Sequence, residues 1–171
     1  MRTARLAWPL MCMFLSGFVV ARATNGLLRS DLEPFVGTWT LDASQSSAAE
    51  PEWRAITLGE QSLRIEIHRP DDDRPPALIY NLDGTRRTNP FGSGSAVTEI
   101  RRDQNDIVTS TVFTINERPV TVQERMTITP AGDLATVVTA RVEHGYEGVS
   151  PPLTTQPPNV SEASRIFRKK Q

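Results

Sequence analysis

Glu124 is the charged residue whose position says most about chemistry in this sequence. It shares the alternate positions of one strand-like segment with the apolar residues Val120, Val122, Met126 and Ile128. A carboxylate on an apolar face must be ion-paired, hydrated or protonated, because burying an isolated charge is costly. Three interpretations follow: the carboxylate fixes the polar head of an apolar ligand, it pairs with an arginine near a barrel rim, or a bulge turns it outward.

Other residues that could carry chemistry are sparse. His68 is expected to face solvent, whereas His144 continues an apolar face and is expected to look inward. No histidines, cysteines or close carboxylates show metal-ligand spacing, and Asp71–Asp73 is more typical of a solvated turn than of a calcium loop. There is no Gly-x-Ser-x-Gly elbow, and the one cysteine is Cys12. We therefore expect no metal and no cofactor, and we expect binding rather than catalysis.

These residues lie on a chain in which apolar and polar residues alternate with the period of half-buried β-strands. Nine strand-like segments follow one another without crossover helices. Residues 83–95 and 145–161 are expected to be irregular loops, and residues 30–36 a short helical entry with Ser30 as N-cap. Because closure removes exposed sheet edges, we predict an all-β fold: a single antiparallel up-and-down β-barrel of about 8–10 strands. A two-sheet sandwich is the alternative.

Trp39 opens the first of these strands, two residues after Gly37. In a closed barrel the first and last strands are neighbours, so the indole is expected to pack in the barrel floor. An arginine of the last strand is expected to lie over its ring, where cation–π attraction stabilises it. Arg165 and Arg168 lie on opposite faces of that strand, and both are candidates.

The segment FVGTWTLDAS, residues 35–44, resembles the opening of the lipocalin-like (calycin) β-barrels. Gly37, Trp39, Leu41 and Asp42 fit the pattern of small exported bacterial members of uncharacterised role, and the terminal RIFRKK strand extends the likeness over most of the chain. The resemblance implies a barrel with an apolar cavity and no particular ligand. The chain lacks the disulfide-bearing loop and the aspartate-rich second motif of typical lipocalins.

Residues 1–23 have the pattern of a secretory signal peptide: a basic head, an apolar run and a small-x-small site ending at Ala23. We expect residues 24–171 to form the barrel domain, exported to the periplasm or the extracellular space, with no membrane-spanning segment after cleavage. The formal net charge is −1 and becomes more acidic once the leader arginines are removed. We therefore expect no nucleic-acid partner, since such binding needs clustered positive charge.

The predicted function is non-covalent binding of one small, largely apolar molecule inside the barrel. The predicted ligand-contacting residues are inward apolar and aromatic side chains with Glu124 as polar anchor: Trp39, Tyr80, Phe113, Val122, Glu124, Met126 and Val138. Two alternatives stay open. Large inward residues at every layer would indicate an envelope structural or protein-interaction domain with a filled interior. Ordered polar pairs inside the cavity would favour an enzyme acting on a lipophilic substrate.

Overall fold

The computed structural model describes residues 27–47, 50–143 and 158–170. This part of the chain is built almost wholly from strands, with one short α-helix and two 3-10 turns near its start. The helical elements are α1 (Arg29–Leu32), η1 (Glu33–Phe35) and η2 (Ala43–Gln45). The strands are β1 (Gly37–Leu41), β2 (Trp53–Leu58), β3 (Ser62–His68), β4 (Ala77–Asn81), β5 (Arg87–Phe91), β6 (Gly94–Asp103), β7 (Asp106–Ile115), β8 (Arg118–Ile128), β9 (Leu134–Val142) and β10 (Asn159–Lys169).

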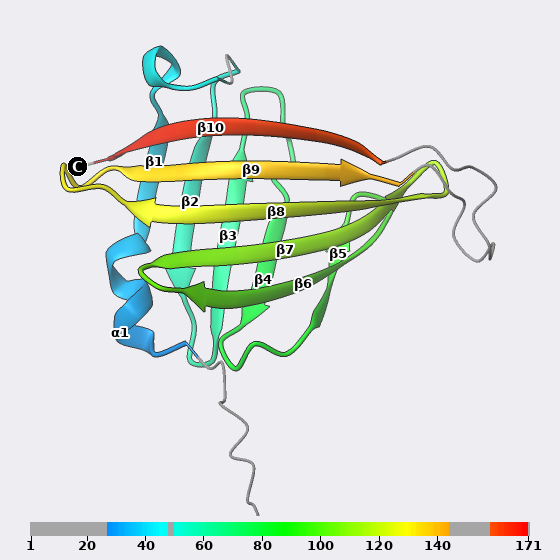
Figure 1. Ribbon diagram of the computed structural model, residues 1–171, viewed down its shortest axis with the longest axis horizontal. Coiled ribbons are helices and arrows are strands. Elements are labelled where there is room, and N and C mark those ends of the chain that lie inside the picture. Colours follow the sequence, from blue (N-terminus) through cyan, green and yellow to red (C-terminus); the bar gives the residue numbers. More distant parts are fainter. Residues whose placement is uncertain (1–26, 48–49, 144–157, 171) are drawn as a thin grey trace, which may run out of the picture.

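The strands form one antiparallel sheet in the order β4-β3-β2-β1-β10-β9-β8-β7-β6-β5. In Figure 1 the long strands β6–β10 cross in front of the steeper strands β1–β4, so the sheet folds over on itself. β1 pairs with β10, with Trp39 opposite Lys169 and Leu41 opposite Phe167. The first and last strands are therefore neighbours, and the predicted antiparallel barrel is confirmed as a nearly closed, ten-stranded one.

A side chain, and not a backbone ladder, joins β4 to β5 in the described residues. Asn89 of β5 is buried, and its Oδ1 accepts a hydrogen bond from the Ile79 N–H at 3.0 Å. Its Nδ2 donates to the Ile79 carbonyl at 3.0 Å, and the Thr98 hydroxyl donates to the same carbonyl at 2.6 Å. The amide of Asn89 thus takes the place of a strand partner for Ile79.

Three expectations about local structure are wrong. Residues 159–161 were expected at the end of an irregular loop, but they form the start of β10 and pair with β9. Residues 87–91 fall in a predicted irregular loop, but they form β5 and pair with β6. Their polar sequence and Pro90 hid the strand, although an edge strand tolerates proline because one of its sides needs no ladder. The short helix begins at Arg29, so Ser30 lies inside it and is not the N-cap. The Asp31 carboxylate instead accepts a hydrogen bond from the Leu28 N–H at 3.2 Å.

Trp39 packs into the floor of the barrel as expected, but the cation over its ring is a lysine. The indole is buried, and its Nε1 donates to the Phe35 carbonyl at 2.8 Å. Lys169 Nζ lies 5.2 Å from the ring centroid, because Lys169 is the inward residue directly opposite Trp39. A Cβ at Gly37, whose φ is +141°, would lie 2.9 Å from Lys169 Cε, so glycine lets the lysine approach.

The prediction that Arg165 or Arg168 covers Trp39 is therefore wrong. Arg168 points outward, where it pairs with Asp42 at 3.2 Å and with Asp133 at 2.6 Å. Arg165 lies on the same face of β10 as Phe167 but contacts Glu52. The register of β10 against β1, which places Lys169 opposite Trp39, thus decides which cation meets the indole.

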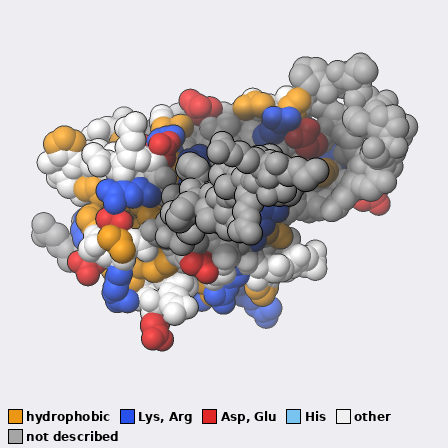
Figure 2. All heavy atoms as spheres, turned by 60° about the horizontal axis from the view of Figure 1, so that its bottom comes forward, with side chains coloured by type: hydrophobic (Ala, Val, Ile, Leu, Met, Phe, Trp, Pro, Cys, Tyr) orange, Lys and Arg blue, Asp and Glu red, His pale blue; other side chains and the backbone are white. Residues whose placement is uncertain are grey.

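Apolar side chains fill the half of the barrel around Trp39. They come from α1 and from strands on all sides, and the largest are almost completely buried: Leu32, Ile56, Leu63, Ile100, Met126, Leu134 and Phe167. Figure 2 shows lysine, arginine, aspartate and glutamate side chains interspersed on the outer face turned toward the viewer. No described helix is long and apolar enough to cross a membrane.

Candidate functional site

A cavity of about 200 Å³ occupies the other half of the barrel interior. Most of its wall is apolar, and Phe91 and Phe113 face each other there with ring centroids 4.7 Å apart. The lining residues project inward from eight strands, with Arg69 following β3: Arg54, Ile65, Ile67, Arg69, Leu78, Tyr80, Phe91, Thr109, Thr111, Phe113, Val122, Glu124, Val138 and Arg165. An apolar wall with a few converging polar groups is the usual form of a small-molecule site.

A larger hollow of about 820 Å³ lies beside Leu27, Glu60 and Asp83. Its lining comes from strand ends and turns, and several of these residues are exposed to solvent. It therefore lacks the enclosed apolar wall that binds a small molecule by burial. We take the interior cavity as the candidate site.

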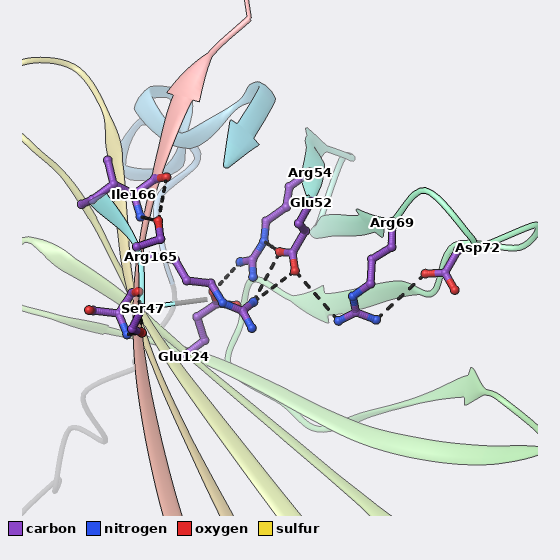
Figure 3. Close-up of polar contacts among 10 residues, drawn as sticks. Ser47, Glu52, Arg54, Arg69, Asp72, Glu124, Arg165 and Ile166 are labelled. Atoms are coloured by element: carbon purple, nitrogen blue, oxygen red, sulfur yellow. Dashed lines mark hydrogen bonds and ion pairs between the residues drawn. The ribbon is translucent and has the colours of Figure 1, made fainter. Parts of the chain in front are cut away.

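Arg54 is the centre of a buried ion network on the cavity wall (Figure 3). It shares the inward face of β2 with Ile56, and its side chain is 1% exposed. Its Nε donates to Glu52 Oε1 at 2.6 Å, and its Nη1 donates to Glu124 Oε1. The guanidinium carbon also lies 4.6 Å from the ring centroid of Phe167. Two carboxylates and one aromatic ring therefore satisfy a cation that water cannot reach.

Burial and ion pairing act in opposite directions on Arg54. Burial by itself lowers its pKa, because it disfavours the charged form. The nearby carboxylates of Glu124 and Glu52 outweigh this effect and hold the pKa above its ordinary value. Removing one partner of such a buried pair typically costs about 3–5 kcal/mol, because the other charge stays buried and unpaired.

The network continues from Glu52 toward solvent. Glu52 Oε2 accepts from Arg165 Nη1 at 3.2 Å and lies 3.9 Å from Arg69 Nη2. Arg69 Nη1 lies 4.0 Å from Asp72 Oδ2, and both of these side chains are more than one-third exposed. Figure 3 shows the six charged groups as one chain of contacts. The network thus runs from the buried centre of the barrel to its surface.

Two buried polar atoms have no hydrogen-bond partner among the described residues: Thr136 Oγ1 and Arg165 Nε. Thr136 and Arg165 lie directly opposite each other on β9 and β10. A buried donor or acceptor left without a partner costs about 1–3 kcal/mol. This pair of residues is therefore the least satisfied polar part of the barrel wall.

Tyr80 is one of three neutral polar residues on the cavity wall, together with Thr109 and Thr111. Its hydroxyl lies 3.3 Å from Thr111 Oγ1. Burial raises the pKa of Tyr80 to about 12, and the negative charge of Glu124 acts in the same direction, while hydrogen bonds from Thr111 and Thr109 act against it. The phenol therefore stays protonated at neutral pH and can donate or accept a hydrogen bond.

Five of the seven predicted ligand-contacting residues line this cavity: Tyr80, Phe113, Val122, Glu124 and Val138. Met126 is buried in the core, and Trp39 lies in the barrel floor; neither is on the cavity wall. Glu124 neither faces solvent nor pairs near a rim, since its partner Arg54 is deeply buried. Contact of these residues with a ligand stays a prediction.

The sequence-based expectations missed Glu52, Arg54 and Arg69. Arg54 could have been found by the rule that singled out Glu124, because it alternates with Ile56 on an otherwise apolar face of β2. Glu52 and Arg69 lie just outside the ends of β2 and β3, where alternation gives no signal.

His68 lies on the outer face of β3 with Glu66, as expected, but its side chain is only 19% exposed. Its ring stacks on Trp53 with centroids 3.5 Å apart and an interplanar angle of 9°. His144 lies outside the described residues. The described residues contain no group of three metal-ligating side chains.

Comparison with known proteins identifies the fold but no family. No family model matches the chain, and no curated protein matches it. A solved secretary abundant heat soluble (SAHS) protein from Ramazzottius varieornatus is similar, with a TM-score of 0.55 and 10% identity over 80% of this chain and 96% of that chain. The REP1-NXSQ fatty acid transporter has a TM-score of 0.55 and 11% identity over 81% and 98% of the two chains.

Lipid binding protein 8 of Caenorhabditis elegans is also similar, with a TM-score of 0.53 and 10% identity over 81% of this chain and 97% of that chain. At such low identity these likenesses establish the fold alone. The chain thus has the fold of the calycin-like barrels, the group that holds the fatty-acid-binding and lipocalin-type proteins.

Proposed function

We propose that this barrel binds one small, largely apolar molecule non-covalently in its interior cavity. The observation that carries the proposal is the interior space of about 200 Å³ with its mainly apolar wall. Burial of apolar ligand surface supplies roughly 25 cal/mol per Å² of driving force. Two structural neighbours, which are named as a fatty acid transporter and a lipid binding protein, are in keeping with this proposal.

The two alternative functions, a domain with a filled interior and an enzyme acting in the cavity, have less support. Large side chains fill only the half of the barrel around Trp39, whereas a filled interior requires them at every layer. Ordered polar pairs do lie in the cavity, as an enzyme would need. Both carboxylates of the buried network, however, are bound to guanidinium groups, and Tyr80 is held protonated. The described cavity wall therefore offers no free general base, and we place binding first.

A cavity-filling variant tests the proposal. Val138 is on the cavity wall, and its neighbour Val137 on the same strand points outward and is 38% exposed. We expect Val138→Trp to weaken binding of an apolar fluorescent probe at least tenfold, because the indole occupies the ligand's space, whereas Val137→Trp leaves it unchanged. Equal binding by both variants, with cooperative thermal melts in each, would contradict an interior site.

We further infer that the protein is exported. The support is the leader pattern of residues 1–23, with its basic head, apolar run and small-x-small site. The proposed place of action is the periplasm or the extracellular space.

A further inference from the structure

The charges of the ion network beside the cavity cancel one another, although Glu124 is its one carboxylate on the described cavity lining. The lining contains three arginines, and the network that binds them contains three carboxylates: Arg54, Arg69 and Arg165, with Glu52, Glu124 and Asp72. Figure 3 shows that each guanidinium is engaged by at least one of these carboxylates. Each arginine of the described lining is therefore already engaged by a carboxylate, and Arg165 Nε is the one buried guanidinium atom among them without a hydrogen-bond partner.

Glu124 is the carboxylate that completes this balance on the cavity wall. Its side chain is 12% exposed and bound to the buried guanidinium of Arg54. A carboxylate on a ligand would meet the negative charge of Glu124 at the place where it could otherwise pair with Arg54. Like charges brought together in a water-poor site cost several kcal/mol, and proteins use such contacts to reject the wrong partner.

We propose that Glu124 is a specificity-determining residue that makes the cavity select neutral ligands with a hydrogen-bonding oxygen and reject monoanions. This inference rests on the proposed function, since it concerns the ligand of the same cavity. Uncharged polar groups remain on the wall to bind such an oxygen: the hydroxyls of Tyr80, Thr109 and Thr111. An alcohol or a ketone can form hydrogen bonds there without disturbing the ion network.

The cavity volume sets the size of suitable test ligands. At about 200 Å³ the cavity exceeds an apolar cavity of about 150 Å³ that binds benzene. It is smaller than typical ligand pockets, which start at about 300 Å³. Ligands with a chain of about eight carbons are therefore appropriate, and 1-octanol, 2-octanone and octanoate differ only in their polar end.

The experiment measures displacement of an apolar fluorescent probe by these three ligands near pH 7.5, where octanoate is charged. We expect the wild-type barrel to bind octanol and octanone at least tenfold more tightly than octanoate. Glu124→Gln keeps the side-chain shape and removes one negative charge. We expect it to raise octanoate affinity relative to octanol at least tenfold.

A matched control is Glu99→Gln, since Glu99 pairs with Arg86 on the outer surface. We expect this variant to keep the wild-type ratio of octanoate to octanol affinity. If Glu124→Gln fails to fold, Arg165→Gln tests whether the charge balance of the network sets ligand selectivity, because it removes a positive charge instead of a negative one. It leaves the network one cation short, so affinity for octylammonium relative to octanol should rise at least tenfold.

Wild-type binding of octanoate as tight as that of octanol would overturn the inference and leave the proposed function standing. An unchanged ratio in a folded Glu124→Gln variant would do the same, as would an unchanged octylammonium ratio in Arg165→Gln. If the wild-type barrel binds neither the probe nor any of the ligands, the proposed function itself fails. The two failures are therefore distinguishable.

Discussion

Tyr80 shows at the scale of one residue how the cavity wall keeps a polar group neutral. Its phenol is buried between the Thr111 hydroxyl and the negative Glu124, and burial is the main reason that its pKa rises to about 12. In the unfolded chain a tyrosine ionises near its ordinary value of 10.0. Between these two pH values the unfolded chain has lost a proton that the folded barrel keeps. The free energy of unfolding must therefore fall as the pH rises through this window.

We predict that replacing Tyr80 by phenylalanine reduces this loss of stability at high pH. The contribution is about 2–3 kcal/mol between pH 10 and 12, because one pKa unit corresponds to about 1.4 kcal/mol. Urea unfolding followed at several pH values from about 8 to about 12 measures it. A Tyr80→Phe variant that loses stability as steeply as the parent would show that the phenol is not shielded.

At the scale of elements, the contact between β4 and β5 is the weakest part of the wall. Elsewhere around the barrel, neighbouring strands share backbone ladders. Here one amide side chain, Asn89, serves both polar groups of Ile79. Leu78 and Tyr80, which flank Ile79 on β4, line the cavity. The closure of the cavity on this side therefore depends on side chains, chiefly Asn89 with support from Thr98.

We predict that Asn89→Ala destabilises the barrel by about 2 kcal/mol, because it leaves buried backbone groups of Ile79 with fewer partners. Hydrogen exchange at the Ile79 amide should accelerate with it. Thr88→Ala, at the exposed neighbouring position of β5, serves as the control and should change neither quantity. An Asn89→Ala variant with parental stability and exchange would mean that other groups close this side of the barrel.

At the scale of the whole molecule, the described barrel is already joined to the chain at Leu27, shortly after the predicted leader ends. The Leu27 N–H already donates to the Leu82 carbonyl at 2.8 Å, so the chain is joined to the barrel a few residues after Ala23. The floor beyond it is filled by Leu32, Phe35 and Trp39. Removal of residues 1–23 should therefore leave the packed core intact.

We predict that protein recovered from its own host begins at Thr24 and lies outside the cytoplasm. Intact-mass measurement and N-terminal sequencing test this directly. As a control, Ala23→Pro places a proline in the cleavage site and should block processing. Recovery of the wild-type chain with its first residues in place would contradict export by this route.

The alternation of apolar and polar residues by itself predicted every strand except β5, because period-two burial depends only on neighbours along the chain. The closure of β1 on β10 was expected for another reason, namely that it removes exposed sheet edges. It also identified Glu124 as a carboxylate on an apolar face. Only the tertiary structure decided that Arg54 neutralises it, because these residues lie on β2 and β8, far apart in sequence. The register of β1 against β10 likewise decided that Lys169 covers Trp39. The missing backbone ladder between β4 and β5 showed that Asn89 bonds to Ile79 in its place. Pairing across a barrel depends on distances through its interior, and a local pattern does not contain them.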